Sequence, residues 1–202
     1  MKYLMLLVLI LCAHSVSADP VLVTGFGPFG RHEQNISSLV VEHIAQYRED
    51  IITAVIPVDW EQSAVFASSI DPGMIRGVIA LGIDEGITDE IILELQAYNR
   101  TSRFPDTSGK FPPDHGEVVP GAPELLKSPA AEQMASHFPV SRDPGGYLCG
   151  WFYYLLLHHL ENLPVVFLHI PPEMKIDQAV SSVLKMLDLL FPLQNTANLP
   201  GS

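Results

Sequence analysis

Two almost purely apolar runs constrain the fold of this chain more than any other feature of its sequence. Residues 78–82 read Val-Ile-Ala-Leu-Gly, and residues 165–170 read Val-Val-Phe-Leu-His-Ile. Strands that do not alternate between apolar and polar residues are buried on both faces, which is typical of parallel strands covered by helices. Because segments with helical periodicity separate such runs, the sequence predicts an α/β fold. We expect a three-layer α/β/α sandwich around a mixed, mainly parallel sheet.

The other elements follow from periodicity and from residues that begin and end helices. The first strand is expected to begin at Val21, and further strands are expected over residues 51–58, 78–82, 91–99 and 165–170. Helices are expected over residues 35–47, 60–70, 125–137, the apolar run after Cys149, and 176–191. Residues 100–124 contain five prolines and three glycines. Such a long irregular segment is typical of the lid or wall of a site.

Composition restricts the class of protein. The chain has 202 residues, of which 48% are hydrophobic and 17% are charged, which suits one globular domain with a sizeable core. The formal net charge is −12, and no stretch is rich in lysine or arginine, which argues against nucleic-acid binding. The sequence leaves open whether the chain forms a homo-oligomer.

The first 18 residues have the form of a secretory signal peptide. Lys2 supplies a positive charge, residues 3–11 are apolar, and Val16-Ser17-Ala18 offers small residues for cleavage before Asp19. The apolar run is too short to span a membrane. The alternative is a buried N-terminal strand or helix.

We therefore expect residues 1–18 to be a signal peptide and residues 19–202 to form a single domain. The protein would be exported to the periplasm or secreted if the leader is used, and cytoplasmic otherwise. No stable membrane association is expected after the leader is cleaved.

Loss of the leader would leave Cys149 as the only cysteine. It follows a Pro-Gly-Gly turn at residues 144–146 and precedes a long apolar run. We expect it at the N-terminus of a buried helix, where the macrodipole favours a thiolate. His169 is the one polar residue in the run 165–170. A nucleophile on a turn and a histidine at a strand end fit cysteine-dependent hydrolysis; the alternative is a cysteine packed in the core.

Two further features have more than one interpretation. Residues 25–30 read Gly-Phe-Gly-Pro-Phe-Gly, with the glycine spacing of a phosphate-binding loop, but the proline removes a backbone donor. Phe26 and Phe29 in this loop either fill the core or line a small apolar pocket. Glu94 lies in the apolar stretch 91–99, so its carboxylate must either face solvent or be buried with a partner.

Five blocks of sequence occur in the order found in one peptidase family. They are Gly25–Gly30 with Asn35, Glu94–Asn99, Pro105-Asp106 with Gly109, Gly146-Tyr147-Leu148-Cys149, and Phe167–Pro171. Over residues 21–191 the chain resembles pyroglutamyl peptidase type I, also called pyrrolidone-carboxylate peptidase, a family of cysteine peptidases. Three features depart from the family pattern: Ile36, Gly150 and the acidic turn Ile83–Ile87, which replaces a glycine-rich pocket wall.

The resemblance implies a phosphorylase/hydrolase-like fold and a Cys149–His169–Glu94 catalytic triad. Cys149 would attack the amide carbonyl, His169 would transfer the proton, and Glu94 would orient His169. Phe26 and Phe29 would bind the pyrrolidone ring of peptides with an N-terminal pyroglutamate, without a cofactor or a metal.

Two other interpretations stay open. One is a catalytically altered or non-catalytic member of the family that binds small lactams or blocked peptide N-termini. The other is a cysteine hydrolase of a different amide. The sequence also does not decide between Glu94 and Glu90 as the partner of His169.

Overall fold

A mixed sheet of six strands lies at the centre of the protein, of which this computed structural model describes residues 19–87, 89–113 and 116–193. The strands lie in the order β2-β1-β3-β8-β4-β7. Their bounds are Val21–Phe26 (β1), Ile51–Ile56 (β2), Gly77–Ile83 (β3), Ile92–Glu94 (β4), Val140–Ser141 (β7) and Val165–Ile170 (β8). Among these strands, β4 and β8 pair antiparallel and the other neighbours pair parallel.

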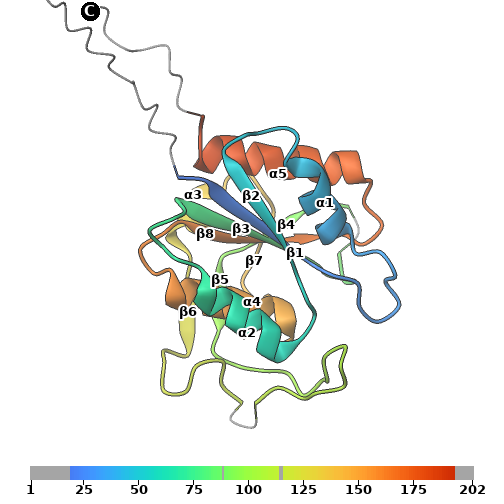
Figure 1. The fold of residues 1–202 in the computed structure, drawn as a ribbon, viewed down its shortest axis with the longest axis vertical. Helices are drawn as coiled ribbons and strands as arrows, with labels where there is room; N and C mark the ends of the chain where they lie inside the picture. Colours follow the sequence, from blue (N-terminus) through green and yellow to red (C-terminus); the bar gives the residue numbers. More distant parts are fainter. Residues whose placement is uncertain (1–18, 88, 114–115, 194–202) are drawn as a thin grey trace, which may run out of the picture.

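Helices cover both faces of this sheet (Figure 1). One face packs against α1 (Ile36–Ile44), α3 (Pro129–Met134) and α5 (Ile176–Leu190), and the other against α2 (Trp60–Ser69) and α4 (Leu148–His159). Successive residues of β3 enter opposite cores, because Ile79 belongs to the first and Ala80 to the second. The expected α/β/α sandwich is confirmed, and β3 and β8, the two apolar runs, are buried along their whole length.

The stretch 91–99 is not the single strand that the sequence predicted. β4 ends at Glu94, and after Leu95 the chain forms β5 (Gln96–Tyr98), which pairs antiparallel with β6 (Leu125–Lys127) in a separate two-stranded sheet. Leu95 is 3% exposed. The apolar pattern therefore continues through the point where the chain leaves one sheet for the other, which is why periodicity did not reveal the break.

The helix expected over residues 125–137 is also shorter than predicted. Residues 125–127 form β6, and α3 begins at Pro129. The Ser128 hydroxyl accepts the Ala131 N–H at 3.0 Å, so Ser128 is the N-cap and Pro129 occupies the first turn. A serine followed by proline is a strong helix start, and it outweighs the helical periodicity before it.

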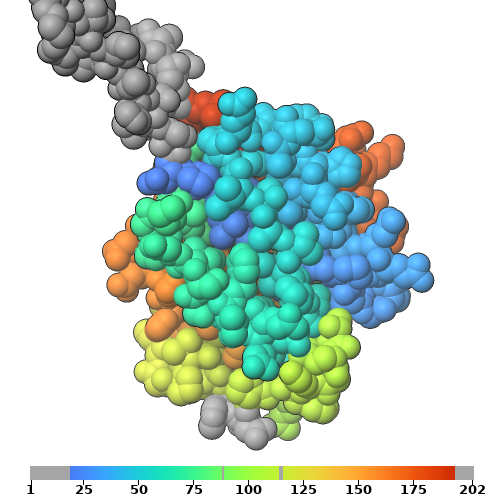
Figure 2. Space-filling model, in the orientation of Figure 1, coloured from blue at the N-terminus to red at the C-terminus, as the bar shows by residue number. Residues whose placement is uncertain are grey.

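The described part of the segment between β5 and β6 forms no helix or strand, as expected. The buried side chain of Asn99 organises it. Its Oδ1 accepts the N–H groups of Val118 and Val119, and its Nδ2 donates to the carbonyls of Val119 and Ala122. Figure 2 shows this segment, in yellow-green, along the end of the molecule next to α2. Because this buried amide makes four hydrogen bonds, it fixes the irregular segment as a wall.

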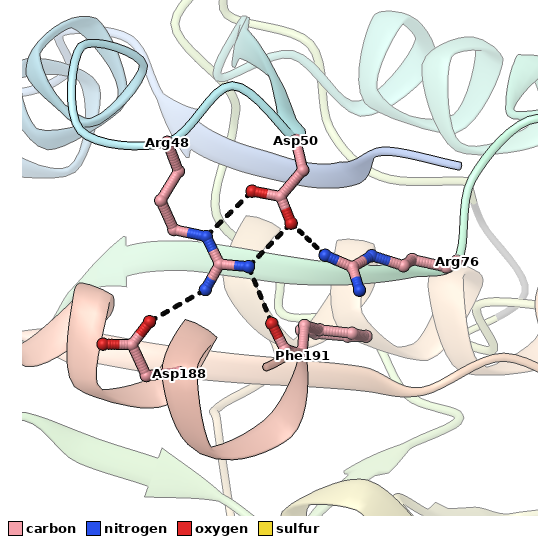
Figure 3. Close-up of polar contacts among 5 residues, drawn as sticks. All are labelled: Arg48, Asp50, Arg76, Asp188 and Phe191. Atoms are coloured by element: carbon pink, nitrogen blue, oxygen red, sulfur yellow. Dashed lines mark hydrogen bonds and ion pairs between the residues drawn. The ribbon is translucent and has the colours of Figure 1, made fainter. Parts of the chain in front are cut away.

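A network of charges ties the amino ends of β2 and β3 to the end of α5 (Figure 3). The buried Arg48 guanidinium donates to both carboxylate oxygens of Asp50, to Asp188, and to the carbonyl oxygen of Phe191. Arg76 also donates to Asp50 and lies over the Phe191 ring. These residues come from three parts of the chain, so the network fixes how those parts pack.

The expected leader, residues 1–18, and the end of the C-terminal tail, residues 194–202, lie outside the described residues. Of the helices that the structure describes, none is long and apolar enough to cross a membrane.

Candidate active site

Cys149 is the second residue of α4, at the helix N-terminus that the sequence predicted. Tyr147 is the N-cap, and its own side chain makes no capping hydrogen bond. The Trp151 N–H donates to the Tyr147 carbonyl at 2.9 Å, so the N–H groups of residues 148–150 precede the first bond of the helix. The Cys149 side chain is only partly exposed, between the helix and the sheet.

The turn before Cys149 folds back onto the helix. Gly145 has a φ of +78°, in the left-handed region that favours glycine. A Cβ atom on Gly150 would lie 1.8 Å from the Gly145 carbonyl oxygen, so any side chain there would displace the turn. Gly150 is one of the departures from the family pattern, and this close approach is its structural reason.

His169 and Glu94 meet across the antiparallel pair β4 and β8. Ile92 lies opposite His169, and Glu94 lies opposite Phe167. Since alternate residues share a face, Glu94 is the diagonal neighbour of His169 on the face that packs against α4. His169 Nδ1 donates to Glu94 Oε1 at 2.8 Å, and the two residues are 4% and 2% exposed. Glu90 lies exposed in the loop before β4, so Glu94 is the carboxylate next to His169.

The sulfur of Cys149 lies beside this histidine. Burial would lower the pKa of His169, but hydrogen bonds with Cys149 and Glu94, together with their charges, outweigh it and raise the pKa to about 10. Because Nδ1 bonds to Glu94, Nε2 is the nitrogen left for the sulfur. At neutral pH the imidazole therefore carries a proton that it can deliver beside Cys149.

Gly82, whose role no sequence motif indicated, makes room for the sulfur. It is aligned with His169 in the register of β3 and β8. A Cβ on Gly82 would lie 2.7 Å from Cys149 Sγ and 2.8 Å from the Phe167 ring. A glycine within an apolar strand was the signal in the sequence, since such glycines often mark a close approach.

Tyr153 fixes the distance between α4 and the sheet, and it too was missed. It lies one turn after Cys149, on the same side of the helix. Its hydroxyl donates to the Glu94 carbonyl oxygen at 2.9 Å, and burial raises its pKa well above the usual value. Phe167 fills the space between, with ring centroids 5.4 Å from Tyr153 and 5.0 Å from His169.

The two phenylalanines of the glycine-rich loop differ in burial. Phe26 ends β1, is 3% exposed, and packs edge-on against Phe152 of α4 at 5.7 Å. Phe29 is only partly buried, with its ring 6.4 Å from that of Tyr147. Asn35 holds the loop, because its Nδ2 donates to the Gly27 carbonyl oxygen. Phe29 is thus the ring that a ligand could reach directly.

Asp106 attaches the irregular segment beside the site. Its carboxylate accepts the N–H groups of Trp60, Ser108 and Lys110 and the Ser108 hydroxyl. Burial alone would raise the pKa of Asp106, but these hydrogen bonds outweigh it and lower the pKa. The Tyr147 hydroxyl donates to the carbonyl of the preceding residue, Pro105. The wall is therefore bonded both to the start of α2 and to the N-cap of the cysteine helix.

Within the described residues, no three His, Cys, Asp or Glu side chains gather as a group that could hold a metal ion. What the site does contain is a buried, carboxylate-bound imidazole beside a cysteine at a helix N-terminus. The fold and this site define a hydrolase of the cysteine-peptidase class.

Comparisons with known proteins identify the family. The sequence model described as pyroglutamyl peptidase matches residues 19–187. A pyrrolidone-carboxylate peptidase of Clavibacter michiganensis subsp. michiganensis is 30% identical over 193 residues, covering 81% of this chain and 88% of the relative. Pyroglutamyl-peptidase 1 of Homo sapiens is 26% identical over 200 residues, covering 88% and 94%.

A solved structure has the same fold. The crystal structure of pyrrolidone carboxyl peptidase from Thermus thermophilus superposes with a TM-score of 0.71 at 29% identity, covering 83% of this chain and 98% of that one. This chain belongs to the pyroglutamyl peptidase family.

Proposed function

We propose that this protein hydrolyses the amide bond after an N-terminal pyroglutamyl residue of a peptide, with Cys149, His169 and Glu94 as its catalytic triad. The observation that carries the proposal is the buried hydrogen bond of His169 with Glu94 beside the sulfur of Cys149. A nucleophile, a base and a group that orients the base are the three parts that acyl transfer requires. Family membership supports the substrate class.

In the proposed reaction, the Cys149 thiolate attacks the pyroglutamyl carbonyl carbon, and an electron pair moves onto the carbonyl oxygen. Protonated His169 then gives its Nε2 proton to the leaving amine as the C–N bond breaks, which leaves a thioester. Neutral His169 takes a proton from water, whose oxygen attacks the thioester. Pyroglutamate leaves, and the thiolate and the protonated imidazole are restored.

The protein would stabilise charge at two points of this cycle. The positive imidazole lies next to the attacking sulfur, and the thiolate is the nucleophilic form of cysteine. The N–H groups in the first turn of α4 have no partner within the helix, and because Cys149 belongs to this turn they are suited to hold the oxyanion. Glu94 keeps the imidazole in one tautomer and offsets its charge.

The pyrrolidone ring of the substrate is small, uncharged and half apolar. Phe29, partly buried beside Tyr147, offers an aromatic face to such a ring, and Phe26 would form the floor beneath it. Apolar pockets with a few polar groups are typical of sites for ligands of this size.

The first test is release of aminomethylcoumarin from pyroglutamyl-aminomethylcoumarin under reducing conditions, with Cys149→Ser measured beside the wild type. We expect turnover by the wild type and loss of turnover in the variant. A folded, reduced wild type without turnover would contradict the proposed reaction. An active Cys149→Ser enzyme would instead contradict the assignment of the nucleophile.

We also propose that the protein is exported and loses residues 1–18. Cleavage before Asp19 would spare the fold, since β1 begins at Val21 and the Pro20 carbonyl accepts the Arg76 N–H. N-terminal sequencing of the protein from the extracytoplasmic fraction should begin at Asp19. A cytoplasmic protein that retains Met1 would contradict this proposal.

A further inference from the structure

Glu85 joins two loops at the carboxyl ends of neighbouring strands. It lies in the acidic turn after β3, where the chain departs from the family pattern. His32 Nε2 donates to Glu85 Oε1 at 2.7 Å, and Arg31 Nη2 donates to Glu85 Oε2 at 2.8 Å. Both partners come from the loop after β1. Because β1 and β3 are adjacent parallel strands, the carboxylate bridges the two loops directly.

The histidine of this bridge is also bonded to Phe29. The Phe29 N–H donates to the His32 carbonyl at 3.3 Å, and the His32 N–H donates to the Phe29 carbonyl at 2.9 Å. The rings of Phe29 and His32 lie 5.5 Å apart. Phe29 in turn contacts Tyr147, the N-cap of the cysteine helix. An unbroken series of contacts therefore runs from Glu85 to the edge of the active site.

The two arms of the bridge differ in exposure. The side chain of His32 is 13% exposed, whereas that of Arg31 is 77% exposed. A hydrogen bond from a shielded ring restricts the loop more than an ion pair between exposed side chains, which solvent screens. The hydrogen bond from His32 is also the main cause of the lowered pKa of Glu85. The His32 arm is thus the one that orders the loop.

A cavity of about 320 Å³ lies next to this bridge. Its lining includes His32 and Glu85 together with Pro171 and Pro172. Pro171 follows His169 by two residues, so the cavity adjoins the carboxyl end of β8 that carries the catalytic histidine. The bridge therefore lies at the same end of the sheet as the site.

We propose that Glu85 and His32 are positioning residues that hold Phe29 in place for the pyrrolidone ring, which would make the acidic turn a substitute for the family's pocket wall. The inference deepens the proposed function and rests on it. Phe29 would contact the ring equally in the bound substrate and in the transition state. Loss of such uniform binding raises KM and leaves kcat unchanged.

The test compares Glu85→Ala with Glu33→Ala in hydrolysis of pyroglutamyl-aminomethylcoumarin. Glu33 is an exposed glutamate in the loop after β1, next to His32, so both changes remove one negative charge. We expect Glu85→Ala to raise KM by roughly two- to fivefold, the size of effect typical of the contacts of one exposed carboxylate, with kcat unchanged. Glu33→Ala should behave as wild type. Glu85→Gln, which keeps an acceptor for His32, should recover most of the lost affinity.

Hydrogen exchange at the Phe29 and His32 amides separates this inference from the proposed function. In Glu85→Ala, these two amides should exchange faster than in the wild type or in Glu33→Ala. This expectation holds whether or not the protein turns over the substrate. Equal exchange in the two variants would overturn the inference, as would a fall in kcat with KM unchanged. Faster exchange without any turnover in the wild type would uphold the positioning of Phe29 and overturn only the reaction.

Discussion

At the scale of single residues, Glu94 offers a test of the triad that separates charge from shape. Glu94→Gln keeps the size of the side chain and an oxygen for His169 Nδ1, but removes the charge that offsets the imidazolium. We expect kcat to fall roughly 10²- to 10⁴-fold, as for other residues that orient a catalytic histidine. Glu90→Gln, in the exposed loop before β4, is the matched control and should keep wild-type turnover. Equal turnover in the two variants would remove Glu94 from the mechanism.

Gly82 is a second residue whose substitution should act directly on the active site, because it leaves space for the Cys149 sulfur. In Gly82→Ala, the new methyl group would meet Cys149 Sγ at 2.7 Å and the Phe167 ring at 2.8 Å. We expect turnover to fall at least about tenfold as the sulfur moves, with a loss of about 1–3 kcal/mol in the free energy of unfolding from overpacking. Gly86→Ala is the control, because its methyl group would meet only the exposed Asp84 carboxylate, at 3.2 Å. Measured kcat and urea unfolding of both variants check the prediction; a fully active Gly82→Ala enzyme would contradict it.

Sequence motifs identified the residues with distinctive chemistry and missed those that matter by position. Cys149 and His169 were found because a thiol after a glycine turn and an imidazole in an apolar run are unusual. Gly82 and Tyr153 were not, since their importance depends on the register of β3 with β8 and on the packing of α4. The burial of Glu94 stayed undecided for the same reason: its partner lies 75 residues away in the chain.

At the scale of elements, Asp106 connects the irregular wall to the start of α2. In Asp106→Asn, Oδ1 can keep the Ser108 and Lys110 donors, but the amide NH₂ would face the Trp60 N–H. We expect a loss of about 1–3 kcal/mol at neutral pH from the unsatisfied donor. Asp71→Asn is the control, because Asp71 is exposed and its carboxylate accepts the Gly73 N–H in a similar turn.

The pH dependence of this variant has a definite sign. The pKa of Asp106 is lowered from its ordinary value of 3.8, so the charged carboxylate stabilises the fold above that pH. The contribution is lost as the pH falls through the lowered pKa. The difference in unfolding free energy between wild type and Asp106→Asn should therefore be largest at neutral pH and shrink in acid. A difference that grows in acid would contradict this account.

The sequence predicted best those segments whose residues all lie in one strand or one helix. The strand 165–170 and the helix that begins at Ile176 were expected with nearly the observed bounds. The stretch 91–99 was not, because a chain that passes from one sheet to another stays apolar throughout. The segment 125–137 failed for a different reason: a local start signal at Ser128 divided a pattern that was helical on average.

At the scale of the whole molecule, the active site and the stabilising charge network lie at opposite ends of the parallel strands. Cys149, His169 and the loop of Phe29 lie at the carboxyl ends, where open α/β sheets place their sites. The network of Arg48, Asp50 and Asp188 lies at the amino ends. The contacts at the carboxyl ends therefore shape the site, while the charges at the other end hold the layers together.

This separation predicts that stability and catalysis change independently. Arg48→Met keeps the aliphatic volume of a buried side chain but leaves Asp50 with Arg76 alone. We expect a loss of roughly 2–3 kcal/mol in the free energy of unfolding, less than for a pair that loses its only partner, with kcat unchanged below the unfolding transition. Asp188→Asn removes the charge of a carboxylate whose side chain is 69% exposed, so its loss of unfolding free energy should be far smaller. We would measure urea unfolding and pyroglutamyl-aminomethylcoumarin turnover on the same preparations. A fall in kcat of folded Arg48→Met would contradict the prediction, because it would mean that the two ends of the sheet are coupled.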